Sequence, residues 1–212
     1  IDTRVFVLRA FSFGGPALFA GGSFTSAGGV PAARIARFNG SVWSSLGNGT
    51  DGTVKAIAIF DDGSGAAVYA GGAFAMAGGV PASRIAKWDG AAWLPLGVGV
   101  NGEVTALAAF DDGSGPALYV GGAFTSAGGI SVDHVARWSN GDWNPIGIGL
   151  AGNVNALAVY DGALYAGGNF FGTVVRWDGS TWSTIGSLRP SGVVNELTVG
   201  KDSDGPGLFA GG

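Results

Sequence analysis

Short runs of apolar residues alternate along this chain with turns rich in Gly, Asp, Asn and Ser. One such run, Val104 to Phe110, is followed by an Asp-Asp-Gly-Ser-Gly turn and by a second run from Ala117 to Phe124. Two further runs, from Arg84 to Asp89 and from Ala92 to Leu96, lie before Val104 in the sequence. Asp-Gly and Asn-Gly turns between such runs are hairpin signals, and no helical periodicity of useful length occurs. The pattern predicts an all-β protein of short antiparallel strands.

The pattern repeats with a period of roughly 50 residues, the length of one four-stranded propeller blade. An apolar strand ending in a diglycine recurs at spacings of 50, 50, 46 and 44 residues. The diglycines are Gly21-Gly22, Gly71-Gly72, Gly121-Gly122, Gly167-Gly168 and Gly211-Gly212. We therefore predict a single β-propeller domain of four-stranded antiparallel blades. Its units cover about 5–53, 54–103, 104–153 and 154–192, with a partial unit at 193–212.

Residue choice within the units supports this architecture. The first strand is rich in Ala, which suits the crowding of innermost strands around a propeller axis. The diglycine has no Cβ, so a neighbouring blade or strand can approach it closely. Aromatic pairs recur on the third and fourth strands, where large side chains would fill the widening wedge between blades. The pairs are Phe38 with Trp43, Trp88 with Trp93, Trp138 with Trp143, and Trp177 with Trp182.

The order of apolar strand, diglycine, aromatic residue and Trp resembles the kelch-type propeller repeat. The segment Gly21 to Pro31 reads Gly-Gly-Ser-Phe-Thr-Ser-Ala-Gly-Gly-Val-Pro and is similar to repeats of large secreted bacterial proteins. The likeness covers nearly the whole chain, although unit four lacks the Ala-Gly-Gly loop after Phe170. The resemblance implies a secreted or surface repeat protein.

The strand candidates amount to about four and a half blades, which fits a five-bladed ring or a fragment of a larger propeller. A two-strand fifth blade leaves an open edge, and open edges pair readily with other chains. We therefore expect another copy of the chain to complete or extend the fifth blade. The alternative is that the 212 residues are part of a larger ring.

Composition narrows the function. The chain has 42 Gly, no Cys, one His and 12% charged residues, with a net charge of −4. Absence of Cys excludes disulfides and Cys-ligated zinc. The basic residues are scattered, so we predict no nucleic-acid partner. No apolar run reaches the roughly 18 residues of a membrane-spanning helix, so we predict no membrane insertion.

Candidate chemistry is sparse. The Asp61 to Gly65 turn lacks the alternating oxygen ligands of a calcium loop and predicts a hairpin. On the third strand of each of the first four units, a cation precedes the aromatic residue. Its recurrence indicates a structural role, such as packing on a neighbouring Trp. These cations are Arg37, Lys87, Arg137 and Arg176. We predict no catalytic residue, cofactor or metal ligand, and therefore no enzyme.

Residues that break the repeat are the better binding candidates, because loops on a rigid scaffold commonly carry binding. They are Met76, Asp133, His134, Asn169 and Phe171, in or near the loop between the second and third strands. We predict an extracellular or cell-surface protein that acts as a non-catalytic interaction or scaffold module, binding protein, glycan or itself. A carbohydrate-binding propeller with exposed Trp or Tyr is the alternative, and a propeller enzyme the third possibility. Burial of the Trp residues would weaken the carbohydrate interpretation.

Overall fold

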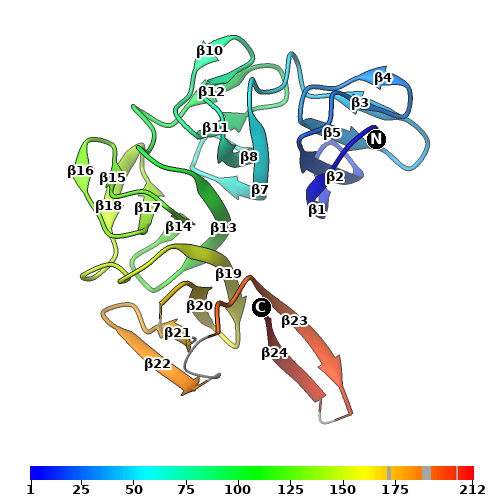
Figure 1. The fold of residues 1–212 in the computed structure, drawn as a ribbon. Coiled ribbons are helices and arrows are strands. Elements are labelled where there is room, and N and C mark those ends of the chain that lie inside the picture. The colour runs from blue at the N-terminus through cyan, green and yellow to red at the C-terminus, as the bar shows by residue number, and fades with distance from the viewer. Residues whose placement is uncertain (171–172, 188–191, 204) are drawn as a thin grey trace.

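The computed structural model describes residues 1–170, 173–187, 192–203 and 205–212. Over these residues, every regular element is a β-strand. Four four-stranded antiparallel sheets and a fifth, two-stranded one follow each other around an open arc (Figure 1). The chain is thus an all-β propeller of about four blades and a partial fifth, which confirms the predicted fold class.

In each complete blade the strands are hydrogen-bonded in chain order, from the innermost to the outermost. The first blade contains β1 (Val5–Ser12), β2 (Pro16–Gly22), β5 (Ile35–Phe38) and β6 (Trp43–Ser45). The second contains β7 (Thr53–Asp61), β8 (Ala66–Ala73), β11 (Ile85–Trp88) and β12 (Trp93–Pro95).

The other three sheets continue the arc in the same order. The third blade contains β13 (Val104–Asp111), β14 (Pro116–Gly122), β17 (Val135–Ser139) and β18 (Asp142–Pro145). The fourth contains β19 (Val154–Tyr160), β20 (Ala163–Gly168), β21 (Thr173–Trp177) and β22 (Trp182–Ser187). The fifth contains β23 (Glu196–Asp202) and β24 (Gly205–Gly211).

The first three blades each carry a small hairpin that the four-strand prediction did not include. It lies between the second and third strands, and Gly28 and Gly29, with φ of 59° and 83°, form its turn in blade one. Glycine adopts these angles without steric cost, so the Ala-Gly-Gly motif marks this turn. The hairpins are β3 (Ser26–Ala27) with β4 (Val30–Pro31), β9 (Met76–Ala77) with β10 (Val80–Pro81), and β15 (Ser126–Ala127) with β16 (Ile130–Ser131).

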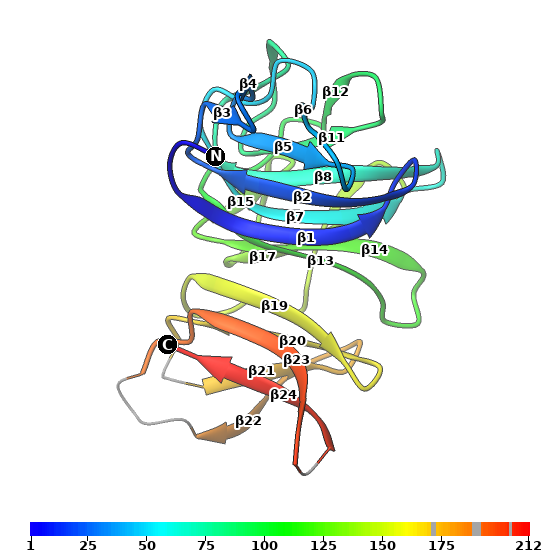
Figure 2. The ribbon, with the colours of Figure 1, turned by 90° about the vertical axis from the view of Figure 1, so that its right-hand side faces the viewer.

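The innermost strands line the centre of the arc. β1 packs against β7, β7 against β13, β13 against β19, and β19 against β23 (Figure 2). The hydrophobic core is divided accordingly, because each junction between consecutive blades holds its own cluster of buried side chains. Stability therefore comes from nearest-neighbour contacts between repeats, as in other repeat proteins.

In each of the four complete blades, the first glycine of the diglycine accepts a side chain from the next blade. A Cβ on Gly71 would lie 2.3 Å from Cγ1 of Val104, and one on Gly121 would lie 2.5 Å from Cγ1 of Val154. Any side chain at these glycines would collide with the following blade. The diglycine therefore sets the spacing between blades.

The Trp residues of the fourth strands in blades two and three tie each of these blades to the one before it. Trp93 Nε1 donates to the carbonyl of Leu46 at 2.8 Å, and Trp143 Nε1 donates to that of Leu96 at 2.9 Å. Four of the seven Trp residues are buried and the other three are half-buried. The Trp side chains thus pack mainly against other residues of the protein and leave little surface exposed.

Candidate functional site

The predicted Asp-rich turns form hairpins whose carboxylates are paired. In blade two, both Asp62 carboxylate oxygens lie 2.7 Å from Lys87 Nζ, and Tyr69 Oη donates to Oδ2 at 2.9 Å. Burial disfavours the charge of Asp62, but hydrogen bonds from Lys87, Ser64 and Tyr69 outweigh it and hold its pKa well below the ordinary value. Burial and the Asp62 hydrogen bond raise the pKa of Tyr69. This Asp and the recurring cation thus neutralise each other.

Blade three repeats the arrangement and extends it to blade four. Asp112 lies 3.5 Å from Arg137 Nη1 and accepts a hydrogen bond from Trp177 Nε1 at 3.0 Å. Burial opposes its charge, while hydrogen bonds from Ser114 and Trp177 lower its pKa below the ordinary value. The sequence indicated a structural role for these cations, such as packing on a neighbouring Trp. The hydrogen bonds of Lys87 and Arg137 run to the turn of their own blade.

The repeat-breaking rim residues lie on three different blades. Met76 is half-buried on β9, where Asp51 Oδ1 accepts its backbone N–H at 2.9 Å. Asp133 is exposed and borders a small cavity of 90 Å³. His134 is half-buried just before β17 with φ of 63°, and its Nδ1 is buried without a hydrogen-bond partner among the described residues. Asn169 is exposed after β20.

Phe171 lies outside the described residues. Of the remaining four rim candidates, Asp133 and His134 are adjacent on blade three, and Met76 and Asn169 lie on blades two and four. Their role in binding stays a prediction.

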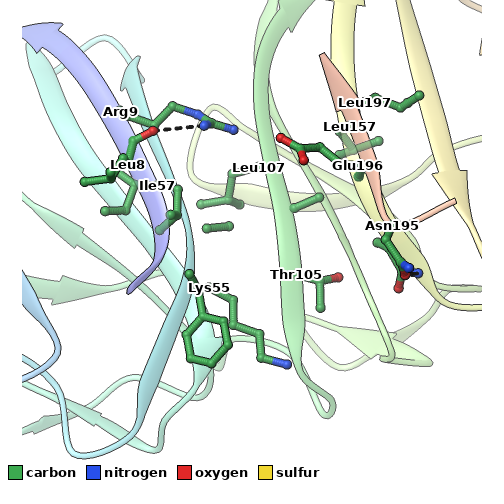
Figure 3. A pocket seen from close by; sticks show the side chains of 16 residues that line it. Leu8, Arg9, Lys55, Ile57, Thr105, Leu107, Leu157, Asn195, Glu196 and Leu197 are labelled. Carbon is green, nitrogen blue, oxygen red and sulfur yellow. Dashed lines mark hydrogen bonds between the residues drawn. The ribbon is translucent and has the colours of Figure 1, made fainter. Parts of the chain in front are cut away.

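A larger hollow lies at the centre of the arc. It has a volume of 790 Å³ and is lined by residues of all five innermost strands or the segments just before them (Figure 3). Drug-sized ligand pockets span about 300–1,000 Å³. We call this hollow the axial channel.

A β-bulge aims one side chain of each complete blade into the axial channel. In the four complete blades, the strand register shifts at one position near the start of the innermost strand, so that a single residue is left unpaired. Bulges often re-aim side chains near functional sites. The bulge residues are Phe6, Lys55, Thr105 and Asn155, and Asn195 takes the corresponding position before β23.

Several bulge side chains bind the next blade. Lys55 Nζ lies 2.9 Å from Glu103 Oε2, and Asn155 Nδ2 donates to Asn195 Oδ1 at 3.2 Å. Thr105 donates its hydroxyl to a backbone carbonyl of the fourth blade. These contacts all run in one direction, from a blade to its successor, and they fix the polar lining of the axial channel.

The first and fifth blades contribute exposed aromatic and charged side chains to the axial channel. Phe6 is 43% exposed, with Arg4 Cζ 5.6 Å and Lys55 Nζ 5.9 Å from its ring centroid. Arg9 on β1 and Glu196 on β23 extend toward one another across the opening (Figure 3). The channel therefore offers an aromatic face, cations, a carboxylate and amides.

Sequence reasoning missed the axial channel because the first strand was read as an Ala-rich packing element. A usable signal existed, since the position after the recurring Val holds Phe6, Lys55, Thr105, Asn155 and Asn195 in successive units. When one position varies within an otherwise repeated strand, packing does not constrain the residue there. Such a position therefore indicates an accessible surface.

Residues 18–41 match the family model described as "Domain of unknown function (DUF5122) beta-propeller". The chain is also similar to the computationally designed Ika8 protein, with a TM-score of 0.58 and 19% identity, over 99% of this chain and 59% of that one. Similarity extends to the extracellular domain of the putative hybrid two component system BT4673 from B. thetaiotaomicron. There the TM-score is 0.57 and the identity 12%, over 95% of this chain and 26% of that one. No curated protein matches the chain.

These likenesses concern the propeller fold. Our chain spans about three fifths of the length of the designed protein and a quarter of that of the BT4673 domain. Among the described residues, no cluster of three or more His, Cys, Asp or Glu side chains could hold a metal, and no helix is long and apolar enough to cross a membrane.

Proposed function

We propose that this chain is a non-catalytic interaction module on the outside of the cell, and that the axial channel is its binding site. One observation carries the proposal. Side chains that recur in every unit serve contacts within and between blades, whereas the bulge residues, which differ from unit to unit, all line the channel. Binding proteins built on rigid repeats place their specificity at such variable positions.

The pairing of the recurring polar groups supports a role without catalysis. Lys87 and Asp62 are bound to each other rather than to the channel, and so are Arg137 and Asp112. A general acid or base needs its proton available to a substrate. The extracellular placement is supported by the resemblance to secreted repeat proteins, and one similar solved structure is itself an extracellular domain.

Ligand screening by NMR tests the proposal. Titration of the ¹⁵N-labelled chain with a panel of oligosaccharides and short peptides should shift amide signals of Phe6, Lys55 and Asn195 first. The pair of substitutions Lys55→Ala and Asn195→Ala should weaken binding by roughly tenfold or more. Shifts confined to the rim around Asp133, chemical turnover of a panel member, or no binding at all would contradict the proposal.

Carbohydrate binding is the second candidate, and Phe6 favours it. An exposed aromatic ring beside charged and amide side chains suits sugar rings, which present both apolar faces and hydroxyls. The burial of Trp93, Trp138, Trp143 and Trp177 argues against sugar stacking on the recurring Trp residues. A glycan array comparing the chain with its Phe6→Ala variant tests this candidate: hits that survive the substitution would remove Phe6 from the site.

A further inference from the structure

In blade three, the segment just before the innermost strand pairs with the small hairpin of its own blade. The N–H of Gly128 donates to the carbonyl of Gly99 at 2.9 Å. The N–H of Asn101 donates to the carbonyl of Ser126 at 3.1 Å. Blade two has the same two hydrogen bonds, between residues 49–51 and β9 with its following glycine. In both blades the hairpin therefore completes a short antiparallel pairing along this segment.

The equivalent segment of blade four, residues 149–151, belongs to a unit without the Ala-Gly-Gly loop. Gly149 stands at the position of Gly99, and its carbonyl accepts no hydrogen bond from any described residue. Ala151 stands at the position of Asn101, and its N–H donates to none of the described residues. Gly149 is half-buried and Ala151 is exposed, whereas Gly99 is buried. We call residues 149–151 the open edge, because its free acceptor and free donor can pair with an added strand.

The side chains that would receive a hairpin are nonetheless present beside the open edge. In blade three, Ala127 is 1% exposed and lies in one buried cluster with Val100 and Trp143. In blade four, Leu150 and Trp182 stand at the positions of Val100 and Trp143 and again share a cluster. Trp182 is only half-buried, whereas Trp143 is buried. Blade four therefore keeps the apolar seat of the hairpin and exposes part of it.

We propose that the open edge and the neighbouring face of Trp182 bind an extended peptide segment of a partner protein, which adds to blade four as a strand. Backbone groups of the partner would bond to Gly149 and Ala151, and side-chain size would give the specificity. The hairpins of the other blades show which sequence fits. A Cβ on Gly128 would lie 2.6 Å from Trp143 Cδ1, so glycine is required against the indole ring. The partner segment therefore carries a small residue followed by glycine, as in Ser-Ala-Gly-Gly.

A partner protein is favoured over a second copy of this chain as the source of the segment. The three Ala-Gly-Gly loops of this chain already pack on the Trp residues of their own blades, through Gly28, Gly78 and Gly128. A second copy would have to open one of its blades to supply a strand and would lose these contacts. The site is also distinct from the axial channel, because neither the open edge nor Trp182 lines that channel.

NMR titration of the ¹⁵N-labelled chain with the peptide Thr-Ser-Ala-Gly-Gly-Ile-Ser tests the inference. The peptide has the sequence of residues 125–131, which include the blade-three hairpin. The amide signal of Ala151 and the indole N–H signal of Trp182 should shift, while the amides that line the axial channel stay unchanged. The same peptide with Leu in place of Ala should not bind, because the equivalent Ala127 is buried.

A substitution that supplies a missing contact sharpens the test. Ala151→Asn should strengthen peptide binding by roughly fivefold, because Asn offers the acceptor that Asn101 presents to two backbone N–H groups of its own hairpin. Asn101→Ala is the matched control and should leave the affinity unchanged, since blade three is filled by its own hairpin.

Equal affinities of the unsubstituted chain and Ala151→Asn, or of the two peptides, would overturn the inference. So would the absence of any shift at Ala151 at the highest peptide concentration. A shift at Ala151 that follows the concentration of the chain alone would assign the open edge to a second copy and would overturn it as well.

Discussion

Blades three and four differ in one coordinated set of features at the same rim. In blade three, Asn101 Oδ1 accepts the backbone N–H groups of Thr125 and Ser126 at 2.8 and 2.9 Å. These groups begin the β15–β16 hairpin, and the hairpin glycine Gly128 packs on Trp143. Asp51 holds the hairpin of blade two in the same way.

Blade four lacks both the hairpin loop and the residue that holds it, and keeps the Trp. Its sequence lacks the Ala-Gly-Gly loop, and Ala151 stands at the position of Asn101. The indole Nε1 of Trp182 is buried without a hydrogen-bond partner among the described residues, whereas the equivalent Trp143 donates to Leu96. We call the residue at the position of Asn101 the clamp, because it holds the start of the hairpin. The comparison teaches that the clamp, the hairpin glycine and the Trp form one unit, since a clamp residue without the loop has no hairpin to bind.

The largest expected effect comes from filling the contact between hairpin and Trp. A Cβ on Gly128, which has φ of +61°, would lie 2.6 Å from Trp143 Cδ1, so Gly128→Ala should destabilise the fold by about 3 kcal/mol through overpacking and backbone strain. Gly129→Ala is the control: its φ is +87° but its Cβ meets nothing, so only about 1 kcal/mol of strain is expected. Equal losses in urea unfolding would show that packing on Trp143 is unimportant.

The two Trp residues should respond differently to removal of the indole N–H. Trp143→Phe removes one of the two hydrogen bonds to the carbonyl of Leu96, which keeps the backbone N–H of Gly99, and should cost about 1.5 kcal/mol. Trp182→Phe breaks no hydrogen bond of its Nε1 and should cost less than about 1 kcal/mol. Guanidinium unfolding of both variants measures the difference, and a larger loss for Trp182→Phe would contradict the comparison.

The clamp should matter only where its hairpin exists. Asn101→Ala removes three hydrogen bonds to the start of the hairpin and should cost about 1 kcal/mol. The reverse change, Ala151→Asn, should have an effect within about 0.5 kcal/mol of zero, since blade four lacks the loop. Stabilisation by Ala151→Asn comparable to the loss in Asn101→Ala would show that this position acts without the loop.

The smallest expected difference concerns the loss of folding stability at low pH. The hydrogen bonds from Ser114 and Trp177 hold the pKa of Asp112 below its ordinary value, so its stabilising contribution is present above pH of about 4 and is lost as pH falls further. The trimmed turn of blade four, at Asp161 and Gly162, has no equivalent second Asp. Asp112→Asn should therefore lose less stability than the unsubstituted chain between pH 5 and 2, measured by thermal unfolding. An unchanged pH slope would contradict this role.

The fold was predictable from sequence because each structural demand recurs in several units. Diglycine, Asp-Gly turn and Trp mark the same positions again and again, so local signals reinforce each other. The extra hairpin was not predicted, since its strands have only two residues each and depend on Trp43 and its equivalents for packing.

The candidate site was predictable only in part. Residues that break the repeat occur on the innermost strands as well as at the rim, and in the sequence only those at the rim stood out. Lys55 and Thr105 looked like ordinary strand residues, because the bulged strand itself has no Gly or Pro at this place, and the diglycine opposite the bulge lies on the neighbouring strand. The clamp could have been found from the sequence. Asp2, Asp51 and Asn101 occupy equivalent positions in the first three units, and Ala151 replaces them in the unit that lacks the Ala-Gly-Gly loop.

The uniform junction at the diglycine has a consequence for how such a chain changes over generations. Each complete blade meets its successor through the same contact between a glycine and a valine, so a duplicated segment arrives with contacts of the kind that its new neighbours already make. The near identity of units two and three, including their Asp-Asp-Gly-Ser-Gly turns, is the pattern that such a duplication leaves. Blade number can thus change by copying, while the bulge residue of each new copy is free to diversify the channel.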